Sequence, residues 1–127
     1  MLFKKNIKIN NFKIGNQHNS FIIAEAGVSH FGSLKKAFKL VDIAVEAKVN
    51  AIKFQLFKTE NLYSKIESPE WFSRMKSREM SYADYEKLIK YCKKKKILLF
   101  STAHDEESLD FLIKNKQKIF KIGSGEI

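Results

Sequence analysis

Apolar residues gather in short, strand-like runs along this chain, and most runs are followed by a stretch with helical periodicity. The runs cover residues 21–27, 51–57, 98–103 and 119–126. After each of the first three, apolar residues recur three or four positions apart, the spacing of one helical face. A strand followed by a helix, repeated, predicts parallel βα units. In such folds the functional residues lie where strands end and loops begin.

Polar and apolar residues alternate over residues 4–15 around Asn10-Asn11, which predicts a β-hairpin ahead of the main fold. We expect residues 1–19 to contain this hairpin and residues 20–127 to hold four strands with their helices. Four such strands are the N-terminal half of a (β/α)8 TIM barrel, a fold that needs about 250 residues. A small four-stranded parallel sheet is the rival architecture.

Helix starts can be read from capping residues. Ser33 and Ser81 are expected N-caps, with Asp84 placed for a capping-box-like contact, and acids from Asp105 onward open the third helix. The segment 58–80 is long for a connection, which is typical of a lid or binding loop.

The composition limits the function classes. The chain carries 24 Lys and Arg against 14 Asp and Glu, a net charge of +10, but its lysines are dispersed as on solvated helix faces. A basic nucleic-acid-binding domain is therefore the weakest hypothesis, since no recognition motif accompanies the charge. The one cysteine, Cys92, is expected in the core. Without an apolar leader or an 18-residue apolar run, we expect a cytoplasmic protein with no nucleic-acid and no membrane partner.

Charged side chains on a buried strand point to a site. Lys53 and Gln55 are two residues apart on the second strand and therefore face the same side. An unpaired buried ammonium is costly, and a phosphate or carboxylate ligand would relieve that cost. The alternative is a purely structural ion pair between Glu25 and Lys53, and the spacing leaves both open.

The last run supplies a second candidate anion site. Two glycines flank Ser124, so that backbone N–H groups could approach a phosphate, and Lys121 adds charge. Glu126 beside them could act as a general base or as a helix-start acid. Thr102, at the end of the third strand, could donate to an anion or simply cap the strand.

Two histidines, His30 and His104, follow the first and third strands. Their position suggests metal ligands, and the alternative is exposed loop histidines without a ligand role.

These strand ends together resemble the sialic acid synthase family, which also makes legionaminic and pseudaminic acids. The resemblance runs from residue 21 to residue 127 through four motifs in the family's order. FIIAEAGVSHFGS resembles the family's IIAEIGxNHxGS, and AIKFQLFKTENL resembles AVKFQTFKAENL. FSTAHDEESLDFL is similar to STPFDEESVDFL, and KIGSGEI to KIxSGEI.

The resemblance implies a (β/α)8 barrel enzyme that condenses phosphoenolpyruvate with an N-acetylated amino sugar to a nonulosonic acid. It implies a divalent metal, Mn²⁺ or Mg²⁺, that polarises the sugar aldehyde, and a homodimer. Carried over by position, the residues that hold phosphoenolpyruvate are Lys53, Gln55, Thr102, Lys121 and Ser124. Those that contact the sugar and the attacking water are Glu25 and Glu126.

The chain also departs from the family pattern. Ser29 stands where the family has Asn, Phe31 where it has Asn or Glu, and Ala103-His104 replaces Pro-Phe. These changes affect the expected sugar specificity. Lys48 and Lys96 stand where related sequences close helices with glycine.

The family's metal-binding histidines belong to later strands, so no metal ligand is expected within residues 1–127 and this chain is expected to be catalytically inactive. The alternative is a non-catalytic half barrel or interaction protein.

Overall fold

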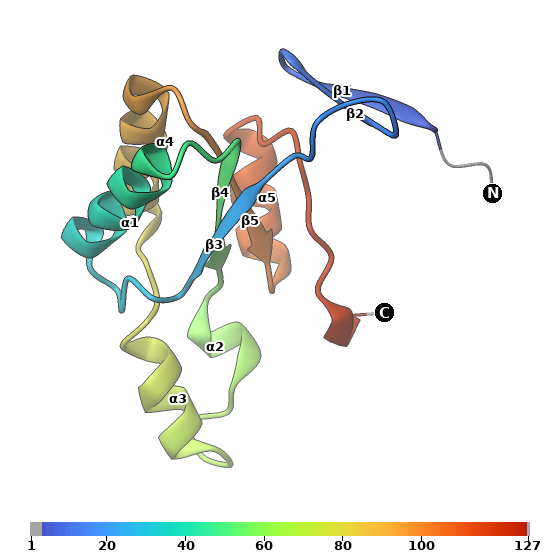
Figure 1. The fold of residues 1–127 in the computed structure, drawn as a ribbon. Coiled ribbons are helices and arrows are strands. Elements are labelled where there is room, and N and C mark those ends of the chain that lie inside the picture. The colour runs from blue at the N-terminus through green and yellow to red at the C-terminus, as the bar shows by residue number, and fades with distance from the viewer. Residues whose placement is uncertain (1–3, 127) are drawn as a thin grey trace.

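The computed structural model describes residues 4–126 and contains an N-terminal hairpin, a parallel sheet, and helices that pack on that sheet or lie beyond its strand ends (Figure 1). In the hairpin, β1 (Asn6–Ile9) pairs antiparallel with β2 (Phe12–Gly15). Asn10 makes the turn with a left-handed φ of 51°, a conformation that asparagine tolerates well. The predicted hairpin is therefore confirmed.

The parallel sheet has three strands in the order β3 (Ile23–Gly27), β4 (Ala51–Leu56) and β5 (Leu98–Ala103). Glu25 is paired with Lys53 in the β3–β4 register, and Gln55 with Thr102 in the β4–β5 register. Because the strands are parallel, all three carboxyl ends meet at one edge of the sheet. The first three predicted strands are confirmed to within two residues.

Three of the helices begin where the capping residues predicted. The bounds of the helices are α1 Leu34–Glu46, α2 Thr59–Leu62, α3 Pro69–Lys76, α4 Tyr82–Lys95 and α5 Glu106–Lys114, with a 3₁₀ turn at Ser124–Glu126. The predicted starts are those of α1, α4 and α5. The side chains of Ser33, Ser81 and Asp105 each accept the N–H three residues further on, which satisfies an otherwise unpaired helix donor. The Asp84 carboxylate pairs with Lys87. No helix within residues 4–126 is both long and apolar enough to cross a bilayer.

One face of the sheet carries the hydrophobic core. Ile52, Phe54 and Leu56 of the central strand are almost completely buried and belong to one cluster with residues of α1, α4 and α5. Burial of each such side chain contributes about 1.5–3 kcal/mol. Cys92 lies in the same core, as predicted, and burial raises its thiol pKa to about 12. The opposite face carries Lys53 and Gln55 together with the buried side chains of Ala51, Phe100 and Thr102, none of which belongs to this core cluster.

The predicted fourth strand is wrong for the described residues, because residues 117–123 are extended but form no ladder. The side-chain amide of Gln117 occupies the outer edge of β5, accepting from the Ser101 N–H at 2.8 Å and donating to the Ser101 carbonyl at 2.9 Å. Phe120 and Ile122 remain 46% and 64% exposed, and a parallel strand is stable only when both faces are covered. The sheet therefore has three strands rather than four.

Three lysines close helices in the left-handed conformation. Lys48, Lys96 and Lys116 follow α1, α4 and α5 with φ values of 56°, 59° and 61°. In each case the next residue donates its N–H to a carbonyl five positions back, the hydrogen bond of a Schellman motif. Glycine adopts this conformation at lower cost, by up to ~1 kcal/mol. Lys48 and Lys96 thus adopt the backbone conformation that suits the glycine of related sequences, and Lys116 is a third case.

Candidate functional site

The structure gathers polar residues at the carboxyl ends of the strands, on the face of the sheet that carries Lys53 and Gln55. Glu25 and Lys53 form an ion pair with 2.5 Å between Oε2 and Nζ. The Lys53 side chain is only 13% exposed, whereas that of Glu25 is 53% exposed. The predicted structural ion pair thus exists, and its carboxylate is open to solvent.

Gln55 and Thr102 extend this group across β4 and β5. They are register partners, and Thr102 is 3% exposed. A bulge between Glu25 and Gly27 ends β3, and such irregularities commonly redirect side chains next to active sites. Gly27 has a φ of 52°, and a side chain there would meet Glu25 Oε1 at 3.4 Å. That distance is an ordinary contact, so the positive φ rather than a lack of space favours glycine beside the Glu25 carboxylate.

The other three predicted site residues do not join this group in the described structure. The Lys121 ammonium donates to the carbonyl of Ile122, its own neighbour. Ser124 is exposed in the 3₁₀ turn, and the Glu126 side chain lies outside the described residues. Four of the seven predicted site residues, Glu25, Lys53, Gln55 and Thr102, are thus adjacent.

His30 is a buried structural histidine, neither exposed nor part of a metal cluster. It is 1% exposed, and its Nδ1 accepts the Gly32 N–H at 3.1 Å. Burial lowers its pKa to about 4, so the ring is neutral at neutral pH. Within residues 4–126, no three His, Cys, Asp or Glu side chains lie close enough together to hold a metal ion. The interpretation of His30 and His104 as ligands of one such cluster is not supported.

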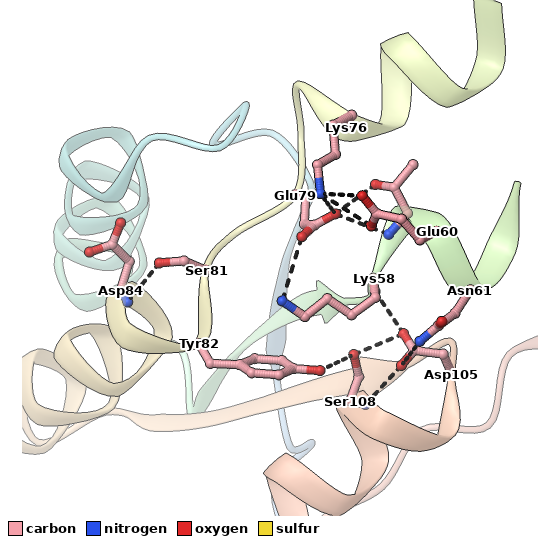
Figure 2. Close-up of polar contacts among 11 residues, drawn as sticks. Lys58, Glu60, Asn61, Lys76, Glu79, Ser81, Tyr82, Asp84, Asp105 and Ser108 are labelled. Atoms are coloured by element: carbon pink, nitrogen blue, oxygen red, sulfur yellow. Dashed lines mark hydrogen bonds and ion pairs between the residues drawn. The ribbon is translucent and has the colours of Figure 1, made fainter. Parts of the chain in front are cut away.

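A network of polar contacts next to these strand ends was not predicted from the sequence (Figure 2). At its centre Asp105 caps α5 by accepting the N–H and the hydroxyl of Ser108, each at 2.8 Å. Asp105 also accepts the Lys58 N–H, at 2.8 Å, and a longer bond from Asn61. Burial alone would raise the pKa of Asp105, but these hydrogen bonds outweigh it and hold the pKa below its usual value. One carboxylate therefore ties the end of β4 to the start of α5.

A second carboxylate, Glu79, anchors the α2–α3 segment in the same network. It accepts the N–H and the hydroxyl of Thr59, at 3.0 and 2.8 Å, and pairs with Lys76 at 3.0 Å. Burial opposes ionisation, but these contacts lower the pKa of Glu79 below its usual value. Lys58 lies between the two carboxylates, 3.7 Å from Glu79 and with its ammonium 4.1 Å from the centre of the Tyr82 ring.

Two sequence signals pointed to this network: the acidic residues from Asp105 onward at the start of α5, and the length of segment 58–80. Contacts between residues 20 to 47 positions apart cannot be read from periodicity.

The loop after β3, where the chain departs from the family pattern, packs closely on the linker between α3 and α4. Gly32 has a φ of 69°, and a side chain there would lie 3.0 Å from the carbonyl of Ser77. Phe31 is 52% exposed, with Lys36 and Arg78 about equally distant from its ring, at 5.2 and 5.1 Å.

The chemical groups at the strand ends are suited to bind an anion and to accept a proton. An ammonium, an amide and a hydroxyl are donors suited to a carboxylate or phosphate, and an exposed carboxylate beside them can accept a proton or hold a hydroxyl.

Comparison with known proteins places this geometry in a family. The sequence profile of the NeuB family matches residues 40–127. The chain is 38% identical to the spore coat polysaccharide biosynthesis protein SpsE of Bacillus subtilis, over 94% of this chain and 35% of that protein. It is 41% identical to the N,N'-diacetyllegionaminic acid synthase of Legionella pneumophila, over 96% of this chain and 38% of that enzyme.

A solved structure agrees with the sequence matches. The N-acetylneuraminic acid synthetase of Leptospira borgpetersenii, crystallised with citrate, superposes with a TM-score of 0.85 and 38% identity. The match covers 92% of this chain and 40% of that one. The chain therefore has the α/β fold of the matching part of a sialic acid synthase, and it spans little more than a third of the length of the two curated relatives.

Proposed function

The chain belongs to the NeuB family, and from this premise we propose that it supplies the phosphoenolpyruvate-binding strand ends of a nonulosonic acid synthase. In the proposed reaction, C3 of phosphoenolpyruvate forms a bond to the aldehyde carbon of an N-acetylated amino sugar, whose oxygen takes up a proton. Water adds to C2, and the bond from C2 to the phosphate oxygen breaks to release inorganic phosphate.

The observation that supports this proposal best is the Glu25–Lys53 pair at the carboxyl ends of the strands. Lys53 is held in place by its partner, so its ammonium is positioned before a ligand arrives. Gln55 and Thr102, adjacent in the register, supply an amide and a hydroxyl for the same anion. We assign these three residues to the carboxylate or phosphate of phosphoenolpyruvate, and Glu25 to the sugar or the attacking water.

Lys121, Ser124 and Glu126 are assigned to the same site by resemblance alone. In the described structure Lys121 and Ser124 lie in the exposed segment after α5.

The divalent metal is an expectation that rests on the family resemblance alone. When bound, Mn²⁺ or Mg²⁺ would polarise the sugar aldehyde. The described residues provide no cluster that fits such an ion, so we assign no metal ligand within residues 4–126.

Binding of phosphoenolpyruvate, measured by isothermal titration calorimetry, tests the proposal without requiring turnover. Lys53→Met keeps the apolar stem but removes the ammonium, and a lost charge-assisted hydrogen bond costs about 1.5–3 kcal/mol, or roughly 10- to 100-fold in Kd. Lys39→Ala, an exposed lysine on α1, is the matched control for net charge. The proposal fails if both variants bind phosphoenolpyruvate equally well, or if the parent chain does not bind it.

A further inference from the structure

A cavity of about 500 Å³ lies away from the candidate site, between α4, α5, the hairpin turn and the start of β5. Its apolar lining includes Ile89 and Cys92 from α4, Leu99 from β5 and Leu112 from α5. Ligand sites for small molecules typically have about 300–1,000 Å³ and a predominantly apolar lining. The cavity therefore has the size and the lining of a small-molecule site.

The polar part of the lining has a single sign of charge. Four exposed lysines contribute to it: Lys93, Lys96, Lys116 and Lys118. None of the described residues that line the cavity is Asp or Glu, and within the described part of the chain these lysines form no ion pair. Lys118 instead donates to the Asn10 side chain in the hairpin turn, at 3.0 Å. A concave apolar surface with one sign of charge focuses its field on an ion of the opposite sign.

Two of these lysines occupy backbone positions that glycine would fill at lower cost. Lys96 and Lys116 are the left-handed residues of the two Schellman motifs that end α4 and α5, and both motifs open onto this cavity. A cation near a helix C-terminus also interacts favourably with the helix dipole, which is the structural explanation for a lysine there. Lys48 has the same motif after α1 but does not line the cavity. A substitution of Lys48 therefore tests the structural role alone, and can be compared with substitutions of Lys96 and Lys116.

We propose that this cavity binds a small amphipathic anion, with an apolar body among Ile89, Cys92, Leu99 and Leu112 and a carboxylate or phosphate head on Lys96 and Lys116. The ligand is held without a covalent bond, because the buried Cys92 thiol is not ionised at neutral pH. The site is independent of the strand-end residues assigned to phosphoenolpyruvate.

Octanoate is a suitable probe. Two control ligands each keep one of its features: 1-octanol has the apolar chain without the charge, and acetate has the carboxylate without the chain. In calorimetric titrations of the full chain we expect saturable binding of one octanoate, and binding of 1-octanol and acetate at least tenfold weaker. The Lys96→Gly/Lys116→Gly double variant is expected to keep or raise the melting temperature, because glycine suits both backbone positions, yet to weaken octanoate binding at least fivefold. Lys48→Gly should also keep or raise stability but leave octanoate affinity unchanged.

Three results would overturn the proposal: no saturable octanoate binding by the folded chain, equal affinity for 1-octanol, or an equal loss of affinity in Lys48→Gly. Phosphoenolpyruvate affinity, measured on the same variants, separates the two sites. It should be unchanged in the double variant, so the failure of either proposal leaves the other testable.

Discussion

Removal of the Asp105 carboxylate is expected to destabilise the chain more than any other single change in the polar network of Figure 2. In Asp105→Ala, the Ser108 N–H loses its cap, and the Lys58 N–H loses the acceptor that joins the end of β4 to α5. The Ser108 hydroxyl loses its 2.8 Å acceptor but stays 3.3 Å from the Tyr82 hydroxyl.

The expected cost follows from these contacts. Loss of an N-cap costs about 1 kcal/mol. A partly buried N–H left without an acceptor costs about 1–3 kcal/mol more. We therefore expect a loss of about 3 kcal/mol in the free energy of unfolding, which lowers the melting temperature of a domain of this size by roughly 10 °C.

Urea unfolding followed by circular dichroism measures this loss as a shift of the midpoint at constant m-value. Asp84→Ala is the control, since Asp84 is an acid in the first turn of α4 whose carboxylate pairs with the exposed Lys87. Its expected cost is below about 0.5 kcal/mol. If Asp105→Ala costs less than 1 kcal/mol, or no more than Asp84→Ala, the strand ends are not held by this carboxylate.

Three other predictions concern His30, Tyr85 and the open sheet. His30 has an ordinary pKa of 6.5 when unfolded and about 4 when folded, so the unfolded chain binds the extra proton between these values. The free energy of unfolding should therefore fall by up to about 2 kcal/mol from pH 7.5 to pH 5. His30→Asn, which keeps an acceptor for the Gly32 N–H, should abolish that fall. An unchanged pH dependence in the variant would contradict the neutral, buried ring. Tyr85→Phe should lower the free energy of unfolding by about 1–3 kcal/mol, because the Tyr85 hydroxyl lies 2.5 Å from the buried Ser101 hydroxyl. The double variant Tyr85→Phe/Ser101→Ala should recover part of that loss, since no hydroxyl is then left without a partner. A double variant that recovers none of it would refute the pairing. Ile23 is 43% exposed on edge strand β3, so light scattering should show that the purified chain self-associates. Ile23→Lys should shift the population toward the 14.8 kDa monomer. A parent chain that stays monomeric at all concentrations would show that this edge does not mediate association.

The sequence predicted those elements whose signals are local. The alternation around Asn10-Asn11 predicted the hairpin, and Ser33, Ser81 and Asp105 predicted the helix starts, because a cap acts on an N–H only three residues away. The Glu25–Lys53 contact could also be anticipated, because neighbouring parallel strands bring their carboxyl ends together.

The features that were missed depend on contacts that leave no periodic trace. Residues 119–122 have strand-forming side chains, but the structure pairs the Ser101 edge with the Gln117 amide instead. His30 follows a strand like a ligand residue, yet the fold of its loop turns the ring inward, where Nδ1 accepts from Gly32. Glu79 was not singled out because its partner Thr59 is twenty residues earlier in the chain.

The location of bound phosphoenolpyruvate tests the central claim most directly. A titration of the ¹⁵N-labelled chain with phosphoenolpyruvate, followed by amide chemical shifts, reports which segments the anion contacts. We expect the largest shifts at the strand ends, in residues 25–27, 53–57 and 101–104, and their loss in Lys53→Met. Shifts confined to the lysines around the α4–α5 cavity, or shifts that persist in Lys53→Met, would contradict the assignment of the strand ends as the substrate site.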